Sequence, residues 1–174
     1  MELQLVSNYS TDERLLPVRG TTGSAGYDLR CAEDTVVPSL WRLLDKYNTT
    51  ENIVMNLDNV PQMLKKLGIK PTLVPTGVRI KLPYDKYAGV HARSSLPLKH
   101  MLIVANDEGI IDSDYYYADN EGHIHVMLLN LAPFDIKIPK YSKIAQLLVK
   151  DFHTVVNDQV ETEKRTGGFG STGN

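Results

Sequence analysis

Residues 123–129 read His-Ile-His-Val-Met-Leu-Leu, and this stretch indicates the fold most directly. Ile124, Val126 and Leu128 occupy every second position. A period of two places such side chains on one face of a β-strand, where they can be buried together. We therefore predict a half-buried strand here.

Several other stretches carry strand patterns. The alternating apolar residues are Leu3 and Leu5; Val78, Ile80 and Leu82, after the turn-rich Pro75-Thr76-Gly77; and Phe134, Ile136 and Ile138. Residues 144–149 are almost wholly apolar, so we expect a strand buried on both faces. Prolines and glycines separate these runs at short intervals. The pattern predicts an all-β fold, an antiparallel sandwich or barrel.

Residues 38–68 depart from this pattern. Their apolar residues follow the helical spacing i, i+3, i+4, i+7 in two runs, Leu40, Leu43, Leu44 and Tyr47, then Val60, Met63, Leu64 and Leu67. Pro38 and Pro61 suit first-turn positions and Gly68 suits a helix C-terminus. We predict a helical hairpin inserted into the β fold. It is either an elaborated surface loop or a contact surface for a protein partner or another subunit.

The composition narrows the class of protein. The chain has 174 residues with 19 Lys and Arg against 21 Asp and Glu, a net charge of −2, which argues against a broad basic surface for nucleic acid. The single cysteine, Cys31, excludes an internal disulfide and a cysteine-based zinc site. No apolar run reaches the roughly 18 residues of a membrane span, and residues 1–14 lack the features of a signal peptide. We expect a cytoplasmic protein (host cytoplasm if viral) that binds neither nucleic acid nor membranes.

The last residues differ again, because four of the 12 glycines lie within residues 167–174. We expect a mobile arm. Its glycines, hydroxyls and cations suit a phosphate, and its one aromatic ring, Phe169, suits a flat ligand such as a nucleobase. The alternative is a disordered tail with an incidental phenylalanine.

Two internal motifs also carry polar groups that suit phosphate chemistry. Residues 92–97, Ala-Arg-Ser-Ser-Leu-Pro, join a guanidinium to two hydroxyls, although a structural ion pair for Arg93 is an equal alternative. Residues 109–115, Gly-Ile-Ile-Asp-Ser-Asp-Tyr, place two carboxylates beside an aromatic ring. Partial desolvation beside Ile111 could raise the basicity of Asp112, although a polar turn is the simpler interpretation. Each motif alone is a weak signal.

Five motifs in order give a stronger one. AGYDL (25–29), ARSSL (92–96), GIIDSDY (109–115), KIAQL (143–147) and GGFGSTG (167–173) resemble the five motifs of the homotrimeric dUTP pyrophosphatase (dUTPase) family. The resemblance implies a β jelly roll (β-clip) and a trimer with shared active sites at subunit interfaces, each closed by a C-terminal arm. It implies one dUTPase-like domain over residues 1–174, with the insertion at about 38–68 and the arm at about 158–174.

The resemblance also implies a reaction. Family members hydrolyse dUTP to dUMP and pyrophosphate with Mg²⁺, which limits uracil in DNA and supplies dUMP. Asp112 would be the catalytic general base that orients a water for in-line attack on the α-phosphate. Such a base typically contributes about 10²–10⁴-fold in rate.

The same resemblance assigns binding roles. Tyr115 would stack on the deoxyribose and exclude a 2′-hydroxyl, and Asn106 lies in the hairpin that would pair with uracil. Asp28, paired with Arg93, would reach the metal through water. The remaining implied substrate-binding residues are Ser94, Ser95, Gly109, Ile111, Gln146, Lys164, Arg165, Phe169, Gly170, Ser171 and Thr172.

The sequence departs from the family pattern in three places. Lys164 stands where the family has Arg, with Arg165 displaced by one, so either cation could meet the γ-phosphate. Residues 116–120, Tyr-Tyr-Ala-Asp-Asn, are an extra five after Tyr115. The third departure is the 38–68 insertion.

Two alternative functions remain. One is a dCTP deaminase, a relative with the same fold, but its catalytic Glu has no counterpart in Ile124–Leu129, which contains no carboxylate. The other is a nucleotide-sensing, partner-binding module on this fold.

His123 and His125 share a strand face, but two ligands without a third do not make a metal site.

Overall fold

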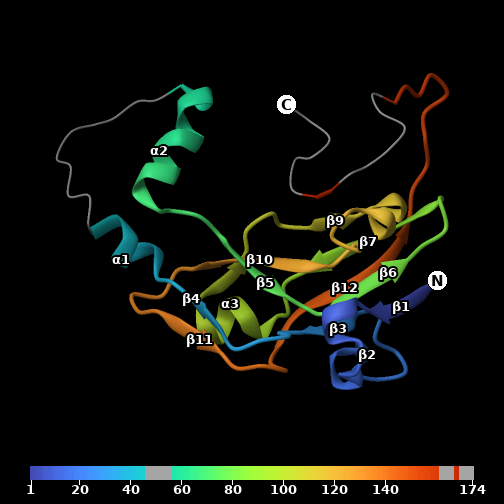
Figure 1. Cartoon of the computed structure of the whole chain (residues 1–174), viewed down its shortest axis with the longest axis horizontal. Coiled ribbons are helices and arrows are strands. Elements are labelled where there is room, and N and C mark those ends of the chain that lie inside the picture. Colours follow the sequence, from blue (N-terminus) through green and yellow to red (C-terminus); the bar gives the residue numbers. More distant parts are fainter. Residues whose placement is uncertain (46–55, 161–166, 169–174) are drawn as a thin grey trace.

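The computed structural model describes residues 1–45, 56–160 and 167–168. It confirms a mostly β fold with few helices, a jelly roll (Figure 1). Its strands are β1 (Glu2–Leu5), β2 (Val18–Arg19), β3 (Tyr27–Arg30), β4 (Thr35–Val37), β5 (Thr72–Pro75), β6 (Val78–Lys81), β7 (Lys86–His91), β8 (Leu102–Val104), β9 (Gly109–Ile111), β10 (His125–Asn130), β11 (Ile136–Ile138) and β12 (Lys143–Asp151). Its helices are α1 (Leu40–Asp45), α2 (Val60–Leu67) and α3 (Ser95–His100), with 3₁₀ turns η1 (Ser7–Tyr9), η2 (Glu13–Leu15), η3 (Leu57–Asn59) and η4 (Ser113–Tyr117).

The largest sheet has the strand order β2-β3-β12-β7-β9 and is antiparallel throughout. Three smaller sheets, β5-β10-β8, β1-β6 and β11-β4, complete the fold. In the large sheet Gln146 of β12 lies opposite Asp28 of β3 on one side and His91 of β7 on the other. Gly109 of β9 lies opposite Val90 of β7. The sheet therefore sets residues from distant parts of the sequence side by side.

The alternation at residues 123–129 predicts the core correctly. Ile124, Val126 and Leu128 are fully buried, and they join one cluster with residues from most of the other strands. Cys31 lies in the same core, where burial raises the pKa of its thiol, as suits an inert cysteine.

Two strand predictions need correction. Phe134 lies outside β11 and is 61% exposed, because residues 132–134 bend while the Asn130 amide donates to the Phe134 carbonyl. Only the first part of residues 144–149 is buried; Leu148 and Val149 are half-exposed. The pairing of β3 with β12 ends at Leu147, so the rest of β12 has a neighbouring strand on one side only.

The predicted 38–68 insertion contains α1 and α2, and its residues 46–55 lie outside the described ranges. Gly68 ends α2 with φ 67°, and its N–H is directed at the carbonyls of Leu64 and Lys65, as predicted. Pro38 does not enter the first turn of α1, because Ser39 occupies the cap and its hydroxyl accepts from the Arg42 N–H at 3.4 Å.

The base of α1 is tied to the loop after β10. The Ser39 N–H donates to Asp135 at 2.9 Å, and Arg42 forms an ion pair with the same carboxylate at 2.8 Å. The Trp41 indole donates to the Leu131 carbonyl at 2.9 Å. The insertion is therefore fastened to the β fold at its start.

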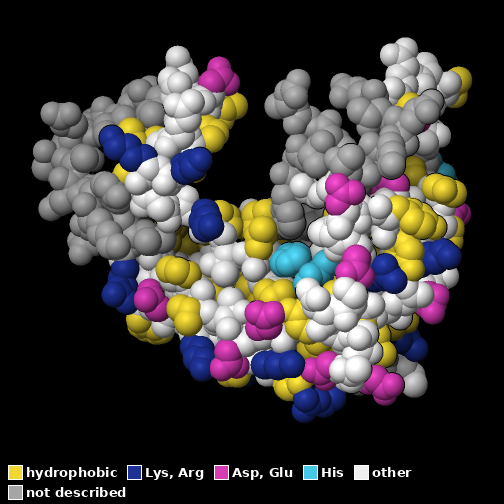
Figure 2. All heavy atoms as spheres, viewed as in Figure 1, with side chains coloured by type: hydrophobic (Ala, Val, Ile, Leu, Met, Phe, Trp, Pro, Cys, Tyr) yellow, Lys and Arg dark blue, Asp and Glu magenta, His cyan; other side chains and the backbone are white. Residues whose placement is uncertain are grey.

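The outer surface carries both charge signs interspersed on the face seen in Figure 2, with histidine side chains near its centre. That face has no broad basic area among its described residues, in agreement with the near-neutral total. Within the described ranges, none of the helices has the length and apolar character that crossing a membrane requires.

Candidate active site

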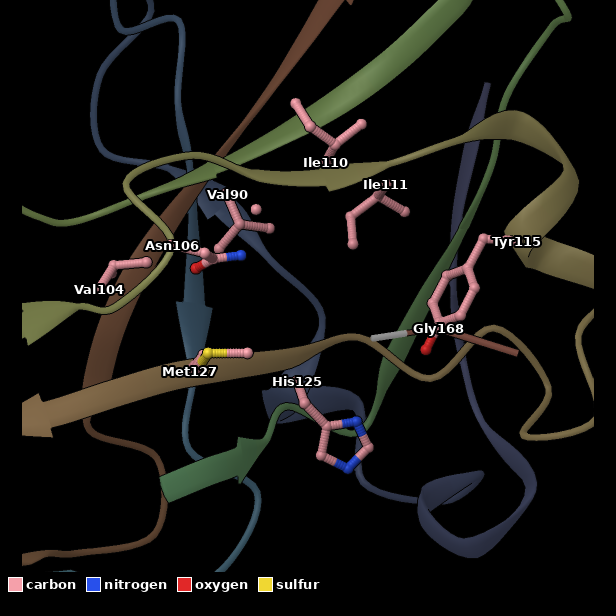
Figure 3. A pocket seen from close by; sticks show the side chains of 10 residues that line it. Val90, Val104, Asn106, Ile110, Ile111, Tyr115, His125, Met127 and Gly168 are labelled. Carbon is pink, nitrogen blue, oxygen red and sulfur yellow. The ribbon is translucent and has the colours of Figure 1, made fainter. Parts of the chain in front are cut away.

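A cavity of about 190 Å³ opens between η4, β10 and residues 102–111, where the chain turns back from β8 to β9. We call this segment the β8–β9 hairpin, although β8 pairs with β10 and β9 pairs with β7. Four of the predicted substrate-binding residues line it together: Asn106, Gly109, Ile111 and Tyr115. In Figure 3 Ile111 and the Tyr115 ring extend toward β10, which carries Met127 and His125, whereas Ile110, also a lining residue, extends from the other side of β9. The other lining residues are Val90, Val104 and Gly168.

The hairpin between β8 and β9 shapes one end of this cavity. Asp107 adopts φ 57°, a left-handed conformation that Asp tolerates in tight turns. The Asn106 amide lies so close to Gly109 that a Cβ there would be 3.2 Å from its Nδ2 and 3.3 Å from the Val90 Cβ. Glycine at 109 therefore lets the Asn106 side chain fold back over β9, toward the cavity (Figure 3).

A charged cluster fastens the hairpin to the large sheet. Glu108 Oε1 lies 2.7 Å from Lys150 Nζ of β12 and 3.3 Å from His91 Nε2 of β7. A Cβ at Gly89 would lie 2.0 Å from the same oxygen, so glycine leaves the space that the carboxylate fills. The hydrogen bond from Lys150, and then the nearby His91, hold the pKa of Glu108 below its ordinary value. The hairpin is thus held from the side opposite the cavity, by residues that the motifs did not indicate.

Asp112 follows β9 directly and occupies the N-cap position of η4. Its side chain is half-buried, and its carbonyl accepts from the Tyr115 N–H at 3.2 Å. One turn therefore carries the predicted base and the predicted sugar-binding ring.

Tyr115 is 5% exposed, and its ring forms one wall of the cavity (Figure 3). Gly168 packs against this ring so closely that a Cβ there would be 3.0 Å from Cε2. The glycine-rich motif thus contacts the cavity at Gly168, one of its two described positions. The other predicted arm residues lie outside the described residues: Lys164, Arg165, Phe169, Gly170, Ser171 and Thr172.

The remaining predicted residues gather on the neighbouring strands of the large sheet. Asp28 is 7% exposed; its Oδ1 lies 2.9 Å from Arg93 Nε and its Oδ2 lies 2.7 Å from Lys143 Nζ. Gln146 stands opposite Asp28, and its Oε1 lies where a Cβ at Gly26 would be 2.7 Å away. Among the described residues that line the cavity, none belongs to this group.

Ser94 and Ser95 stand at the start of α3, with Ser94 at its N-cap position. The Leu96 N–H donates to the Arg93 carbonyl at 2.9 Å, which turns the chain sharply after Arg93. Ser94 and Ser95 therefore lie in the turn that directly follows Arg93.

His125 and Met127 line the cavity, although the motifs did not indicate them. The period-two pattern puts both residues on the strand face opposite the buried one, but it does not indicate that a cavity lies there. His125 Nδ1 lies 3.1 Å from the His123 carbonyl, and the two rings lie 4.1 Å apart.

His123 accepts a hydrogen bond from the Gly77 N–H at 2.9 Å through Nε2. Burial, and then the neighbouring His125, lower the pKa of His123 from 6.5 to about 4. His123 is therefore neutral at pH 7 and serves as a structural acceptor.

The donor set suits a metal ion that arrives with its ligand better than a resident one. Among the described residues, no three His, Cys, Asp or Glu side chains are grouped to hold an ion. Mg²⁺ is commonly bound by one or two carboxylates together with phosphate oxygens and water. Asp28 keeps lone pairs that can accept from a metal-bound water while both its oxygens face cations.

The chain resembles known proteins over most of its length. The family model described as dUTPase matches residues 60–173. A deoxyuridine 5′-triphosphate nucleotidohydrolase of Rickettsia akari (strain Hartford) is 41% identical over 137 residues, which cover 75% of this chain and 88% of the relative. The protein of that name from Lactococcus lactis subsp. lactis is 31% identical over 172 residues, 98% of this chain and 95% of the relative. The crystal structure of dUTPase from Streptococcus mutans superimposes with a TM-score of 0.70 at 29% identity, covering 89% of this chain and 98% of that one.

Proposed function

Because this chain belongs to the dUTPase family of enzymes, we propose that it hydrolyses dUTP to dUMP and pyrophosphate. The observation that carries the proposal is one cavity shared by Asn106, Ile111 and Tyr115, with Asp112 between the last two along the chain. In the cell the reaction would limit uracil in DNA and supply dUMP.

Asp112 is the proposed general base. Its carboxylate accepts a proton from a water molecule, and that water attacks the α-phosphorus in line with the departing pyrophosphate oxygen. The half-buried place of Asp112 at the start of η4 supports this role, because the turn fixes the base relative to the cavity. Positioning and charge stabilisation supply the remaining rate enhancement.

The cavity is proposed to receive the nucleoside. Uracil lies against the β8–β9 hairpin, where Asn106 and Gly109 present polar groups, and the cavity ends too close to the base for a 5-methyl group. The Tyr115 ring packs against the deoxyribose and leaves no room for a 2′-hydroxyl. The burial of that ring supports its use as a fixed wall.

The triphosphate is proposed to lie over the group on the large sheet. Arg93, Ser94, Ser95 and Gln146 bind its oxygens, and Asp28 accepts from a water on Mg²⁺. The ion, when bound, neutralises charge on the triphosphate. The motif of the arm adds Lys164 or Arg165, with Ser171 and Thr172, at the γ-phosphate, while Phe169 and Gly170 cover the uracil.

We also propose that residues 1–174 form a single domain, with the insertion at 38–68 and the arm at 158–174. The domain assembles as a homotrimer with shared active sites in the cytoplasm, or the host cytoplasm if the chain is viral. Trp41 and Leu57 of the insertion are 63% and 84% exposed, which supports a contact with a protein partner there.

The test is nucleotide selectivity. The protein is incubated with dUTP, dCTP, UTP and dTTP in the presence of Mg²⁺, and the products are identified. We expect dUMP and pyrophosphate from dUTP and little turnover of the others. Ammonia released from dCTP would identify a deaminase instead, and binding of dUTP without turnover of any nucleotide would identify a nucleotide sensor.

A further inference from the structure

The extra residues 116–120 do not form a loose loop beside the cavity. Tyr116 packs onto the β1–β6 sheet, where its hydroxyl donates to Gln4 Oε1 at 2.7 Å. The Arg79 guanidinium lies over the Tyr116 ring, 4.6 Å from its centre. One end of the segment is therefore anchored to strands outside the cavity.

The other end of the segment contacts Tyr115 itself. Asn120 Nδ2 donates to Tyr115 Oη at 2.7 Å, and the Tyr115 hydroxyl donates onward to the His123 carbonyl at 3.0 Å. Asn120 is also held, because its Oδ1 accepts from the Gly122 N–H at 3.2 Å and its carbonyl accepts from the His123 N–H at 3.1 Å. The tyrosine hydroxyl is thus both a donor and an acceptor, with each partner fixed by the same turn.

Close packing fixes the turn that follows. Glu121 and Gly122 have φ values of 62° and 67°, and a Cβ at Gly122 would lie 2.7 Å from the Tyr115 carbonyl. Glu121 accepts from the Ser7 N–H at 3.1 Å and also from the Ser7 hydroxyl, which joins the turn to η1. Asn120, which bonds to Tyr115, is therefore followed by a turn that is fixed by its packing against the Tyr115 carbonyl and by its hydrogen bonds to Ser7.

We propose that Asn120 is a positioning residue: it fixes the Tyr115 ring and so sets how strictly the enzyme distinguishes deoxyribose from ribose. The proposal rests on the proposed function, in which this ring faces the sugar. The Tyr115 ring can exclude a 2′-hydroxyl only if the ring is held firmly enough that the hydroxyl does not push it aside. The ring is confined at its hydroxyl by Asn120 and His123 and at its edge by Gly168, so it cannot yield without losing a hydrogen bond or a contact.

The test compares kcat/KM for dUTP with kcat/KM for UTP in the full-length protein. Asn120→Ala should lower the dUTP/UTP ratio about 3–10-fold, the range expected for one hydrogen bond. Tyr115→Phe keeps the ring and removes only the hydroxyl, so it should lower the ratio similarly. The double variant should be no less selective than Tyr115→Phe, because removing the Tyr115 hydroxyl already removes its hydrogen bond with Asn120.

Asp119→Ala is the matched control: it changes an exposed neighbour in the same segment and should leave the ratio unchanged. A wild-type ratio in Asn120→Ala or Tyr115→Phe, or additive losses in the double variant, would overturn the inference. If Asn120→Ala does not fold, Asn120→Ser, whose shorter side chain lacks the Nδ2 donor, takes its place. A wild-type protein that does not hydrolyse dUTP would instead overturn the proposed function, and the inference with it.

Discussion

Asp112 is the residue on which the proposed chemistry depends. Asp112→Asn keeps the size of the side chain and its place at the start of η4, but an amide cannot accept the proton from the attacking water. We expect kcat to fall at least about 100-fold while dUTP affinity stays near that of the wild type. Steady-state kinetics and equilibrium titration with dUTP measure the two quantities.

The exposed Asp119 in the same segment provides the control for this variant. Asp119→Asn removes a carboxylate outside the cavity lining, so its kcat should match the wild type. A near-normal kcat in Asp112→Asn would show that Asp112 is not the base.

His123 makes stability depend on pH. The unfolded chain binds a proton at this side chain near pH 6.5, whereas the folded chain resists protonation until about pH 4. The unfolded state therefore binds more protons across this window, so stability falls as the pH falls through it, by on the order of 1 kcal/mol after allowance for solvent screening. His123→Gln keeps an acceptor for the Gly77 N–H without titrating and should lose less stability between pH 7 and pH 4.5.

Urea unfolding at the two pH values gives this comparison. His153→Gln, at an exposed position, is the control and should behave as the wild type. Equal losses in the wild type and in His123→Gln would contradict the role given to His123.

Single residues also show what a sequence can reveal about this site. Asn106, Gly109, Ile111 and Tyr115 were predicted from motifs, and the structure brings them to one cavity. His125 and Met127 were missed as lining residues, because a period-two pattern separates two strand faces without saying what covers the outer one. Glu108 gave no signal either, since its partners come from β7 and β12.

The element that the Glu108 cluster holds is the β8–β9 hairpin. Glu108→Gln removes the charge that attracts Lys150 and His91, so the hairpin should become more mobile and the KM for dUTP should rise about 3–10-fold, with kcat little changed. Gly89→Ala should act alike, because its Cβ displaces the Glu108 carboxylate. Amide hydrogen exchange at residues 105–109 measures the mobility directly.

A second ion pair between the same two strands provides the control. Lys86 and Asp151 stand opposite each other on β7 and β12, one position beyond Lys150, and their side chains pair with each other and not with Glu108. Asp151→Asn should therefore leave KM and exchange at 105–109 unchanged. The pKa of Glu108 lies below its ordinary value, so the cluster should persist at neutral pH and fail only as the pH falls through that lowered pKa. If hydrogen exchange at residues 105–109 in Glu108→Gln matched the wild type, the charged cluster around Glu108 would not be what holds the hairpin.

At the level of elements, the spacing of apolar residues predicts the type of each element better than it predicts where the element begins and ends. The spacing that predicted helices within 38–68 is matched by α1 and α2. The spacing alone cannot tell whether Pro38 lies in the first turn of α1 or two residues before it, because this depends on which residue caps the helix, and here Ser39 does. The alternation misplaces Phe134, because it does not show that the side chain of Asn130, at the end of β10, bonds to the Phe134 carbonyl where residues 132–134 bend.

At the scale of the whole molecule, we expect the C-terminal arm to be needed for turnover of dUTP but not for the stability of the folded chain. Residues 151–160 are exposed along their length, so they add little to the core. Removing residues 162–174 should therefore cripple dUTP turnover while shifting Tm by less than about 2 °C. A calorimetric scan and a turnover assay on the truncated protein test both statements, and a large drop in Tm would show that the arm is structural.

The net charge of −2 illustrates why a total says little about a site. Arg93 and Lys143 are drawn together at one end of the large sheet by Asp28, which compensates one of the two charges. The composition argues against a broad basic surface, but it cannot locate a small cluster of cations. Only the pairing of β3 with β12 brings that cluster about.

That pairing also bears on how the protein comes into being on the ribosome. β3 (residues 27–30) pairs with β12 (residues 143–151), more than 100 residues later in the chain. β4 likewise pairs with the distant β11. β3 can pair early with β2, but its other edge must wait, without its partner β12, until most of the chain has been translated. Contacts so distant in sequence make folding slow and leave the nascent chain open to aggregation. The Asp28–Arg93–Lys143 cluster can form only after the last strand emerges, so any product of premature termination before β12 would lack it.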